Sequence, residues 1–232
     1  GGWFGRWRGM SMVKSNHKAE RFLIEGHVGA IEVQVEMPVL SEAQPSARGL
    51  AIVAHPHPLF GGTMDNKVAQ TLAKTFSGLG YIAVRFNFRG VGQSAGKHDA
   101  GNGETDDTLL VIEWAQRQYA QHGALVLAGF SFGTLVQSRV APRLNTQGQS
   151  VERMVFVGTA AGKWPVESVP QDTIVIHGEL DDTITLNEAL RWAEPQELPV
   201  VVVAGADHFF HRRLHIIRGI IERQWVYHKT VN

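Results

Sequence analysis

The chain of 232 residues contains no cysteine. This absence excludes disulfide bonds, thiolate metal ligands and a cysteine nucleophile together, and it favours a reducing, cytoplasmic location. Charge of one sign is not in excess either, since Lys plus Arg and Asp plus Glu both number 22. The charge balance therefore gives no indication that nucleic acid or another polyanion is a partner.

Long hydrophobic runs are also missing. No apolar stretch approaches the roughly 20 residues that cross a bilayer, so we expect no membrane span. Residues 1–18 lack the apolar segment and the cleavage site of a secretory signal, and we interpret them as a flexible leader or a remnant of cloning. With 44% hydrophobic residues in the chain, residues 19–232 are sufficient for one sizeable core and are predicted to form a single domain.

Short apolar runs alternate with longer helical patterns. RFLIE (21–25) and AIEVQVEM (30–37) predict an antiparallel hairpin, because the second run alternates between apolar and polar residues. Further strands are predicted at 50–55, 81–88, 124–130, 153–158, 172–178 and 199–205. Helices are predicted at 65–79, 104–120, 132–144, 184–193 and 208–228. This alternation indicates an α/β fold with a largely parallel sheet, helices on both faces and active residues at the carboxyl ends of the strands.

GFSFG (129–133) places a serine between two glycines where a strand pattern gives way to a helix pattern. In G-x-S-x-G the serine has a strained backbone, and the chain passes too close to the glycines for a Cβ atom. This turn would hold the Ser131 hydroxyl above the start of a helix, where backbone N–H groups stabilise negative charge. An ordinary glycine-rich turn with an incidental serine is the alternative, but the strand before and the helix after favour a nucleophile.

A nucleophilic serine needs a base, and the base needs an orienting acid. In this fold the order along the chain is Ser, acid, His, each after a successive strand. Asp181 in GELDD follows the predicted strand 172–178, and His208 in GADHFF follows the predicted strand 199–205. Asp182 is an alternative acid, although the G-x-x-D spacing favours Asp181.

Other polar residues near these motifs have competing interpretations. Asp207 is interpreted as a turn or cap residue, because adjacent residues orient each other poorly. His208, His211 and His215 are at helical spacing and could form a metal face. No carboxylate-rich ligand set accompanies them, so we predict neither a metal nor an organic cofactor.

A tetrahedral intermediate needs two hydrogen-bond donors for its oxyanion. The backbone N–H of Phe132, directly after the nucleophile, is expected to be one of them. The loop AHPHPLFGGTMDN (54–66) would supply the other. Its two prolines have no N–H, so the backbone of His57 is favoured over Leu59 and Phe60.

Three histidine side chains outside the predicted base also need an interpretation. Of His55 and His57, we expect one to order the loop and the other to border the pocket. His177 lies inside a predicted strand and is interpreted as a hydrogen-bonded core residue.

Together these motifs resemble the α/β-hydrolase superfamily, and within it the small bacterial hydrolases near dienelactone hydrolase. The resemblance covers about residues 20–228 and rests on HPHPLFGGTMDN, RFNFRGVGQSAG (85–96), GFSFG, GELDD and GADHFF. It implies an eight-stranded, mostly parallel sheet whose second strand is antiparallel. Dienelactone hydrolase has a cysteine where this chain has Ser131, so the resemblance implies general ester chemistry and not that particular substrate.

Many relatives carry a cap domain before the acid, but here GTAAGKWPVESVPQD (158–172) is too short for a helical cap, so an open site is predicted. Phe60, Trp164 and Phe209 are expected to line an apolar pocket. The predicted function is hydrolysis of small carboxylic esters by Ser131, His208 and Asp181. Thioesterase, acyltransferase, small-amide peptidase and non-catalytic binding module remain alternatives, and the natural substrate and oligomeric state stay open.

Overall fold

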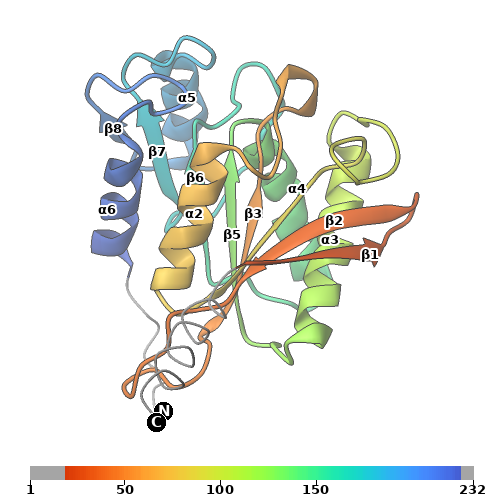
Figure 1. Ribbon diagram of the computed structural model, residues 1–232. Helices are drawn as coiled ribbons and strands as arrows, with labels where there is room; N and C mark the ends of the chain where they lie inside the picture. The colour runs from red at the N-terminus through yellow and green to blue at the C-terminus, as the bar shows by residue number, and fades with distance from the viewer. Residues whose placement is uncertain (1–18, 226–232) are drawn as a thin grey trace, which may run out of the picture.

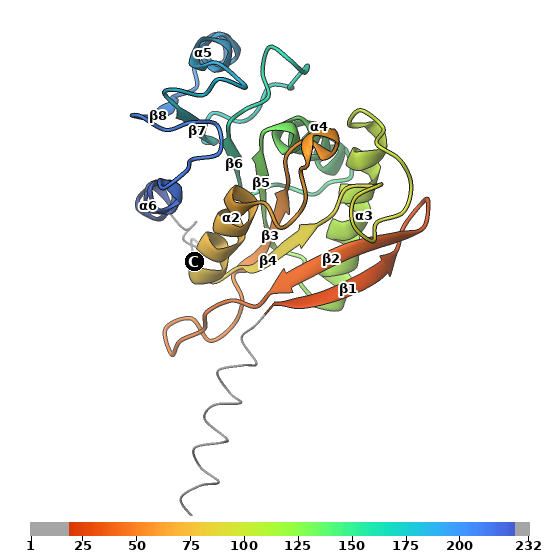
Figure 2. The same ribbon diagram turned by 45° about the horizontal axis from the view of Figure 1, so that its top comes forward.

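A computed structural model describes residues 19–225, so the predicted leader lies outside the described residues. Eight strands form one sheet in the order β1-β2-β4-β3-β5-β6-β7-β8 (Figures 1 and 2). Their bounds are β1 Glu20–Glu25, β2 Ala30–Glu36, β3 Gly49–Ala54, β4 Ile82–Phe86, β5 Ala124–Phe130, β6 Arg153–Val157, β7 Ile174–Gly178 and β8 Val201–Val203. β2 runs antiparallel to β1 and β4, and all other pairs are parallel. The predicted sheet is thereby confirmed.

The first two strands form the predicted hairpin, with Glu20 opposite Val35 and Glu25 opposite Ala30. Val33 and Val35 in β2 are buried, as the alternating pattern predicts. Met37, placed on the same face by the sequence, lies beyond the end of β2 and is 41% exposed.

Helices cover both faces of the sheet. They are α2 Lys67–Gly78, α3 Asn102–Gln118, α4 Phe132–Thr146, α5 Leu186–Ala193 and α6 Leu214–Gln224, with short 3₁₀ turns η1 Pro58–Phe60 and η2 Glu194–Gln196. α2 and α6 lie side by side on one face, whereas α3 and α4 lie on the other (Figure 2). Because both faces are covered, every residue of β3 and nearly every residue of β5 is buried.

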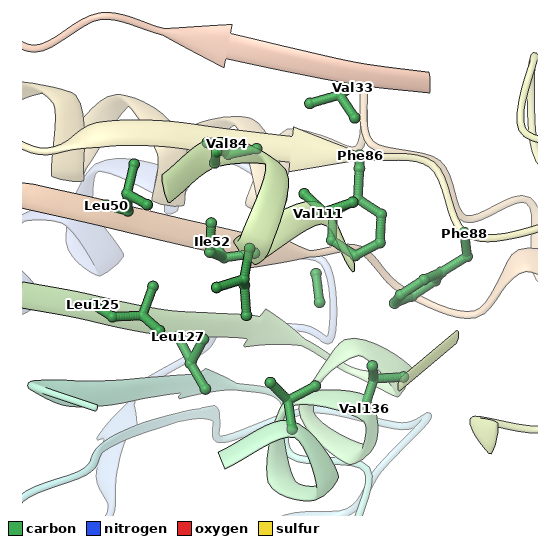
Figure 3. Packing of buried hydrophobic residues seen from close by; sticks show 14 of the residues in the cluster. Val33, Leu50, Ile52, Val84, Phe86, Phe88, Val111, Leu125, Leu127 and Val136 are labelled. Carbon is green, nitrogen blue, oxygen red and sulfur yellow. The ribbon is translucent and has the colours of Figure 1, made fainter. Parts of the chain in front are cut away.

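Successive residues of the central strands point into two separate cores. On the α3–α4 face, Leu50 and Ile52 of β3 pack with Val111 of α3 and Val136 of α4 (Figure 3). On the α2–α6 face, the intervening residues of β3 pack with side chains of α2 and α6, as Ala51 does. The two cores clamp the strands, so the loops at their carboxyl ends start from fixed points.

The chain differs from prediction near its last helix. α6 begins at Leu214 and not at residue 208. Phe210 and Arg212 have φ values of 53° and 62°, which a right-handed helix cannot contain, so residues 208–213 form turns. This irregular segment carries His208. The predicted helix residues after 225 lie outside the described part of the chain.

No helix lies between β6 and β7, and within residues 19–225 no separate cap domain covers the carboxyl end of the sheet. This confirms the prediction made from the short connection. Among the described helices, none is both long enough and apolar enough to cross a membrane.

Candidate active site

Ser131 lies at the sharp turn between β5 and α4. Its φ of 56° and ψ of −121° are unfavourable for a residue with a side chain, so the surrounding structure must hold the turn. The Ser131 N–H donates to the carbonyl of Val157 in the neighbouring strand at 3.0 Å. This bond ties the turn to the end of β6.

The two glycines around Ser131 are required by close approach of the backbone. A Cβ atom at Gly133 would lie 2.3 Å from the carbonyl oxygen of Ala54, and one at Gly129 would lie 2.7 Å from the carbonyl oxygen of Gly133. Both distances are far inside van der Waals contact. The steric explanation of the G-x-S-x-G pattern therefore holds in this chain.

Three side chains from the carboxyl ends of β5, β7 and β8 meet at this turn. His208 Nε2 is 3.0 Å from Ser131 Oγ, and His208 Nδ1 is 2.6 Å from Asp181 Oδ2. All three residues are buried. Asp182, the alternative acid, is exposed. The structure thus brings together the Ser, His and Asp that strand order and spacing favoured.

The carboxylate of Asp181 is oriented by its own loop. Its Oδ1 accepts hydrogen bonds from the backbone N–H groups of Thr183 at 2.9 Å and Ile184 at 2.8 Å. Its Oδ2 is thereby directed to His208. The sequence does not single out these two N–H donors, although Asp often accepts from the backbone N–H two residues on in a turn of this kind.

The imidazole of His208 is held between an aromatic ring and a glycine. The ring centroid of Phe130 is 4.9 Å away with an interplanar angle of 32°. A Cβ atom at Gly158, which follows β6, would lie 3.1 Å from His208 Cε1. Gly158 was missed from the sequence, because its importance depends on a neighbour 50 residues away.

The two predicted oxyanion donors have free N–H groups. Phe132 is the first residue of α4, where an N–H has no partner within the helix. Among residues 19–225, no hydrogen bond is formed by the backbone N–H of Phe132 or His57. In contrast, the N–H of Leu59 donates to His57 Nδ1 and that of Phe60 donates to the His57 carbonyl. The structure therefore leaves His57 available and engages its two competitors.

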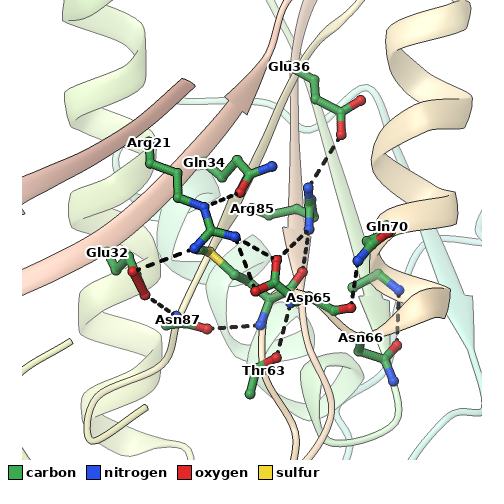
Figure 4. Close-up of polar contacts among 12 residues, drawn as sticks. Arg21, Glu32, Gln34, Glu36, Thr63, Asp65, Asn66, Gln70, Arg85 and Asn87 are labelled. Atoms are coloured by element: carbon green, nitrogen blue, oxygen red, sulfur yellow. Dashed lines mark hydrogen bonds and ion pairs between the residues drawn. The ribbon is translucent and has the colours of Figure 1, made fainter. Parts of the chain in front are cut away.

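A polar network holds the far end of the loop that contains His57 (Figure 4). The backbone N–H of Met64 donates to Asn87 Oδ1 at 2.9 Å, and the Met64 carbonyl accepts from Arg85 Nη1 at 2.5 Å. Asn87 in turn donates to Glu32 Oε1 at 2.6 Å. Both Arg85 and Asn87 lie in the RFNFRG motif, whose supporting role the sequence did not reveal.

The side chains of the two loop histidines have the two roles that the sequence predicts. His55 is fully buried, with Nδ1 2.7 Å from the Pro56 carbonyl and Nε2 accepting from the N–H of Phe88 at 3.0 Å. Burial lowers the pKa of His55 to about 4, so the ring is neutral. His57 borders the cavity, and burial together with the nearby His98 lowers the pKa of its ring.

A cavity of about 260 Å³ opens beside Ser131 and His208. Phe60 and Phe209 line it, as predicted, together with Asn66 and Thr183.

Trp164 does not line this cavity, and that prediction is wrong. Its ring lies 5.1 Å from the ring of Phe132 and 5.5 Å from the ring of His57. It therefore supports the cavity wall from behind. Its partners come from elements far away in the sequence, so residue type alone could not tell packing from lining.

The histidines after His208 do not form a metal face. Asp207 Oδ1 accepts from the N–H of His211 at 2.9 Å, and its Oδ2 contacts the His211 ring, which is a turn-capping role as interpreted. Within the part of the chain that the structure describes, no three His, Cys, Asp or Glu side chains are grouped to hold a metal. His177 is fully buried and contacts the Ile184 carbonyl at 2.7 Å, so its hydrogen-bonded core position is confirmed.

A larger hollow of about 440 Å³ lies between α3 and α4, where Asp106 and Arg143 form an ion pair at 3.0 Å. None of its lining residues is a serine or other nucleophile beside a base. The smaller cavity at Ser131 is therefore the candidate active site.

The sheet order and the serine turn define an α/β-hydrolase fold. The model of the family described as X-Pro dipeptidyl-peptidase (S15 family) matches residues 29–151, which is more than half of the chain. The structure of XC6422 from Xanthomonas campestris, described as a serine hydrolase without lid, is 34% identical, with 89% of this chain and 93% of that chain covered and a TM-score of 0.79. The chain therefore belongs to the S15 family by its matched model, and it is an α/β serine hydrolase similar to those without a lid.

Two further relatives match most of the chain. The structure of an alpha-beta serine hydrolase homologue from Coxiella burnetii is 36% identical, covers 89% of this chain and 97% of that chain, and gives a TM-score of 0.75. The uncharacterized protein RP471 of Rickettsia prowazekii (strain Madrid E) is 31% identical over 194 residues, which are 77% of this chain and 79% of that protein.

Proposed function

We propose that this serine hydrolase cleaves small carboxylic esters through an acyl-enzyme on Ser131. The observation that carries the proposal is the continuous chain of contacts from Ser131 Oγ through His208 to Asp181 Oδ2 at the edge of a cavity. A serine hydroxyl is a weak nucleophile until a base takes its proton, and this arrangement provides the base and its orienting acid.

In the first half of the reaction, Ser131 Oγ attacks the acyl carbon while His208 Nε2 accepts the hydroxyl proton. Asp181 stabilises the imidazolium that forms and holds its Nδ1–H toward Oδ2. His208 then donates the proton to the departing alkoxide, which leaves as an alcohol. In the second half, His208 takes a proton from a water molecule, which attacks the acyl carbon. His208 then donates this proton to Ser131 Oγ as the bond between Oγ and the acyl carbon breaks, which releases the carboxylic acid and regenerates Ser131.

The oxyanion of each tetrahedral intermediate would be bound by the backbone N–H groups of Phe132 and His57. Both groups lack a partner among the described residues, so they bind the oxyanion without breaking other hydrogen bonds. A donor of this kind typically contributes about 3 kcal/mol to transition-state stabilisation. The start of α4 adds the positive end of its helix dipole.

The cavity supports an uncharged acyl group. No Asp, Glu, Lys or Arg belongs to the residues that line it, and Phe60 and Phe209 provide apolar surface. Its volume of about 260 Å³ is below the roughly 300–1,000 Å³ of pockets that enclose drug-sized ligands. A short, uncharged ester is therefore the favoured substrate. The location that we propose is a reducing cytoplasmic compartment, which is consistent with the absence of cysteine.

Cleavage of an X-Pro peptide is the second candidate, because the S15 family model matches residues 29–151. The matched segment contains the serine turn and the loop of His57, but neither Asp181 nor His208. A peptide with a free amino terminus needs a carboxylate to pair with its ammonium group, and none lines the cavity. The lining residues therefore favour the ester.

The proposal is tested with p-nitrophenyl acetate, butyrate and octanoate and with an X-Pro p-nitroanilide. We expect the wild type to hydrolyse the short esters and not the anilide, and Ser131→Ala to reduce the rate to background. Ser150→Ala, at an exposed serine, is the matched control and should leave the rate unchanged. Turnover of the anilide in preference to the esters would establish the peptidase instead, and equal ester activity of Ser131→Ala would exclude Ser131 as the nucleophile.

A further inference from the structure

His177 is a buried histidine that the proposed reaction does not use. It occupies the next-to-last position of β7, and its side chain is completely buried. Its Nε2 lies 2.7 Å from the carbonyl oxygen of Ile184 and 3.4 Å from Asp181 Oδ2. A second imidazole is thus placed behind the acid, on the same carboxylate oxygen that contacts His208.

The surroundings of His177 determine where its ring carries a proton. Its Nδ1 is buried and forms no hydrogen bond with any described residue. A proton on Nδ1 would be desolvated without an acceptor, so the single ring proton belongs on Nε2, facing the carbonyl of Ile184. Burial lowers the pKa of His177, and His208 adds to the effect, while Ile184, Asp181 and Glu188 of α5 oppose it.

Hydrogen bonds connect His177 to the position of the acid through Ile184. The Ile184 N–H donates to Asp181 Oδ1, and the carbonyl of the same residue accepts from His177. The Asp181 N–H donates to the carbonyl of Gly178 at 3.2 Å, at the end of β7. The loop from Gly178 to Ile184, which carries Asp181, is therefore hydrogen-bonded to β7 at both ends: to Gly178 at its start and to His177 at its end.

Packing does not by itself account for an imidazole at this position. An aliphatic side chain would fill buried space without leaving a ring nitrogen unpaired. What only a polar side chain provides here is the donor to the carbonyl of the buried Ile184, which has no other donor among residues 19–225.

We propose that His177 is a positioning residue for Asp181: as a neutral donor it closes the loop from Gly178 to Ile184 and so holds Oδ2 against His208. This inference rests on the proposed function, because it assigns a role that acts through Asp181 on the base His208. His177 touches neither Ser131 nor the cavity, so it is not a catalytic residue.

The first test is ¹⁵N NMR of the histidine rings in the resting protein, which needs no substrate. In the wild type at about pH 7, we expect His177 to be neutral with its proton on Nε2. In His177→Leu, a loosened Asp181 stabilises the His208 imidazolium less, so the pKa of His208 should fall relative to the wild type. His177→Gln can present an amide N–H near the same place, so in this variant the pKa of His208 should return most of the way to the wild-type value.

The second test is the pH profile of kcat/KM with a short ester, expressed per active site counted by a fluorophosphonate titrant. His177→Leu should lower the plateau about tenfold, near the lower limit for loss of an outer supporting partner, and shift the acidic limb to lower pH. Thr173→Val is the matched control, because it deletes a buried hydroxyl just before β7 that has no partner in the described part of the chain. Its plateau and acidic limb should match the wild type.

The inference is overturned if His177→Leu keeps the wild-type pKa of His208 and the wild-type profile, or if His177 of the wild type is charged or protonated on Nδ1. If His177 had a merely structural role, His177→Leu would reduce the number of active sites that the fluorophosphonate counts. The pH profile of kcat/KM per active site would then be unchanged. If His177→Leu does not fold, His177→Gln and the wild-type spectrum still decide the question. Failure of the esterase proposal would leave the NMR result intact, so the two failures are distinguishable.

Discussion

Ser131 Oγ lies 3.0 Å from His208 Nε2 although 77 residues separate the two in sequence. They meet because β5 and β8 are parallel members of one sheet and end at the same edge, with β6 and β7 between them. Asp181 follows β7 and completes the chain of contacts. The site is therefore a property of the sheet edge, and each of its residues depends on the strand that ends before it.

The two neighbouring acids after β7 provide a first prediction. Asp181→Asn should reduce kcat/KM by roughly 10²- to 10⁴-fold, because an amide that turns its N–H₂ toward His208 favours the wrong tautomer of the base. Asp182→Asn should remain within about twofold of the wild type, because Asp182 is exposed and the acid position is already occupied. The kcat/KM of both variants is measured with a short p-nitrophenyl ester, under conditions in which the two variants have matched thermal stability. A larger loss in Asp182→Asn than in Asp181→Asn would reverse the assignment of the acid.

The glycine after Ser131 provides a second prediction. Gly133→Ala should destabilise the protein by about 1–3 kcal/mol or more, since the new methyl group would lie 2.3 Å from the backbone oxygen of Ala54, which cannot move aside as a flexible side chain would. Gly123→Ala is the control, because a Cβ at Gly123 meets nothing within 4 Å. Urea unfolding of both variants measures the difference. Equal free energies of unfolding would show that the turn tolerates a side chain.

Strand ends and their order along the chain made much of this site predictable. Short apolar runs located β5, β7 and β8, and Ser131, Asp181 and His208 each follow one of them, so the sequence alone indicates a shared edge. The spacing after Gly178 also favoured Asp181 over Asp182, although it left Asp182 as an alternative. Local sequence patterns were sufficient to predict these three positions, because each motif directly follows its own strand.

Features that depend on neighbours across the sheet could not be predicted. The backbone of Phe210 and Arg212 has positive φ, which neither residue type signals, so the start of α6 was placed too early. Trp164 packs against the ring of His57 from the loop after β3 and the ring of Phe132 from the start of α4. Gly158 matters because His208 lies against it. The roles of Trp164 and Gly158 each depend on a pair of segments, and a local sequence pattern contains only one member of the pair.

His55 leads to a prediction about stability and pH. The pKa of its ring is about 4 in the folded protein, against 6.5 for a histidine exposed to water, because burial disfavours the charged ring. Between pH 6.5 and pH 4, His55 binds a proton in the unfolded chain but not in the folded protein. The contribution of this group to the free energy of unfolding is therefore complete above pH 6.5 and is lost as the pH falls toward 4. The loss is about 3 kcal/mol over this range.

The measurement compares the free energy of unfolding of the wild type and of His55→Asn from about pH 7 to about pH 4. The variant is less stable at every pH, since it loses contacts with Pro56 and Phe88, but its curve should be flatter by about 3 kcal/mol. Carboxylates and the other histidines titrate in both proteins and cancel in the difference. Parallel curves would mean that His55 titrates normally in the folded state.

The two phenylalanines at the cavity provide the last prediction. Phe60 is 86% exposed and Phe209 is 43% exposed, and both line the space beside Ser131, so they offer apolar surface that an acyl chain can cover without displacing packed side chains. Phe209→Ala and Phe60→Ala should therefore lower kcat/KM several-fold for p-nitrophenyl butyrate and less for the acetate, whose acyl group is too short to cover either ring. Leu23→Ala removes an exposed apolar side chain from β1, outside the cavity lining, and should change neither rate. A uniform loss for both esters in the Phe variants, or an equal loss in Leu23→Ala, would show that the rings support the fold and do not select the acyl group.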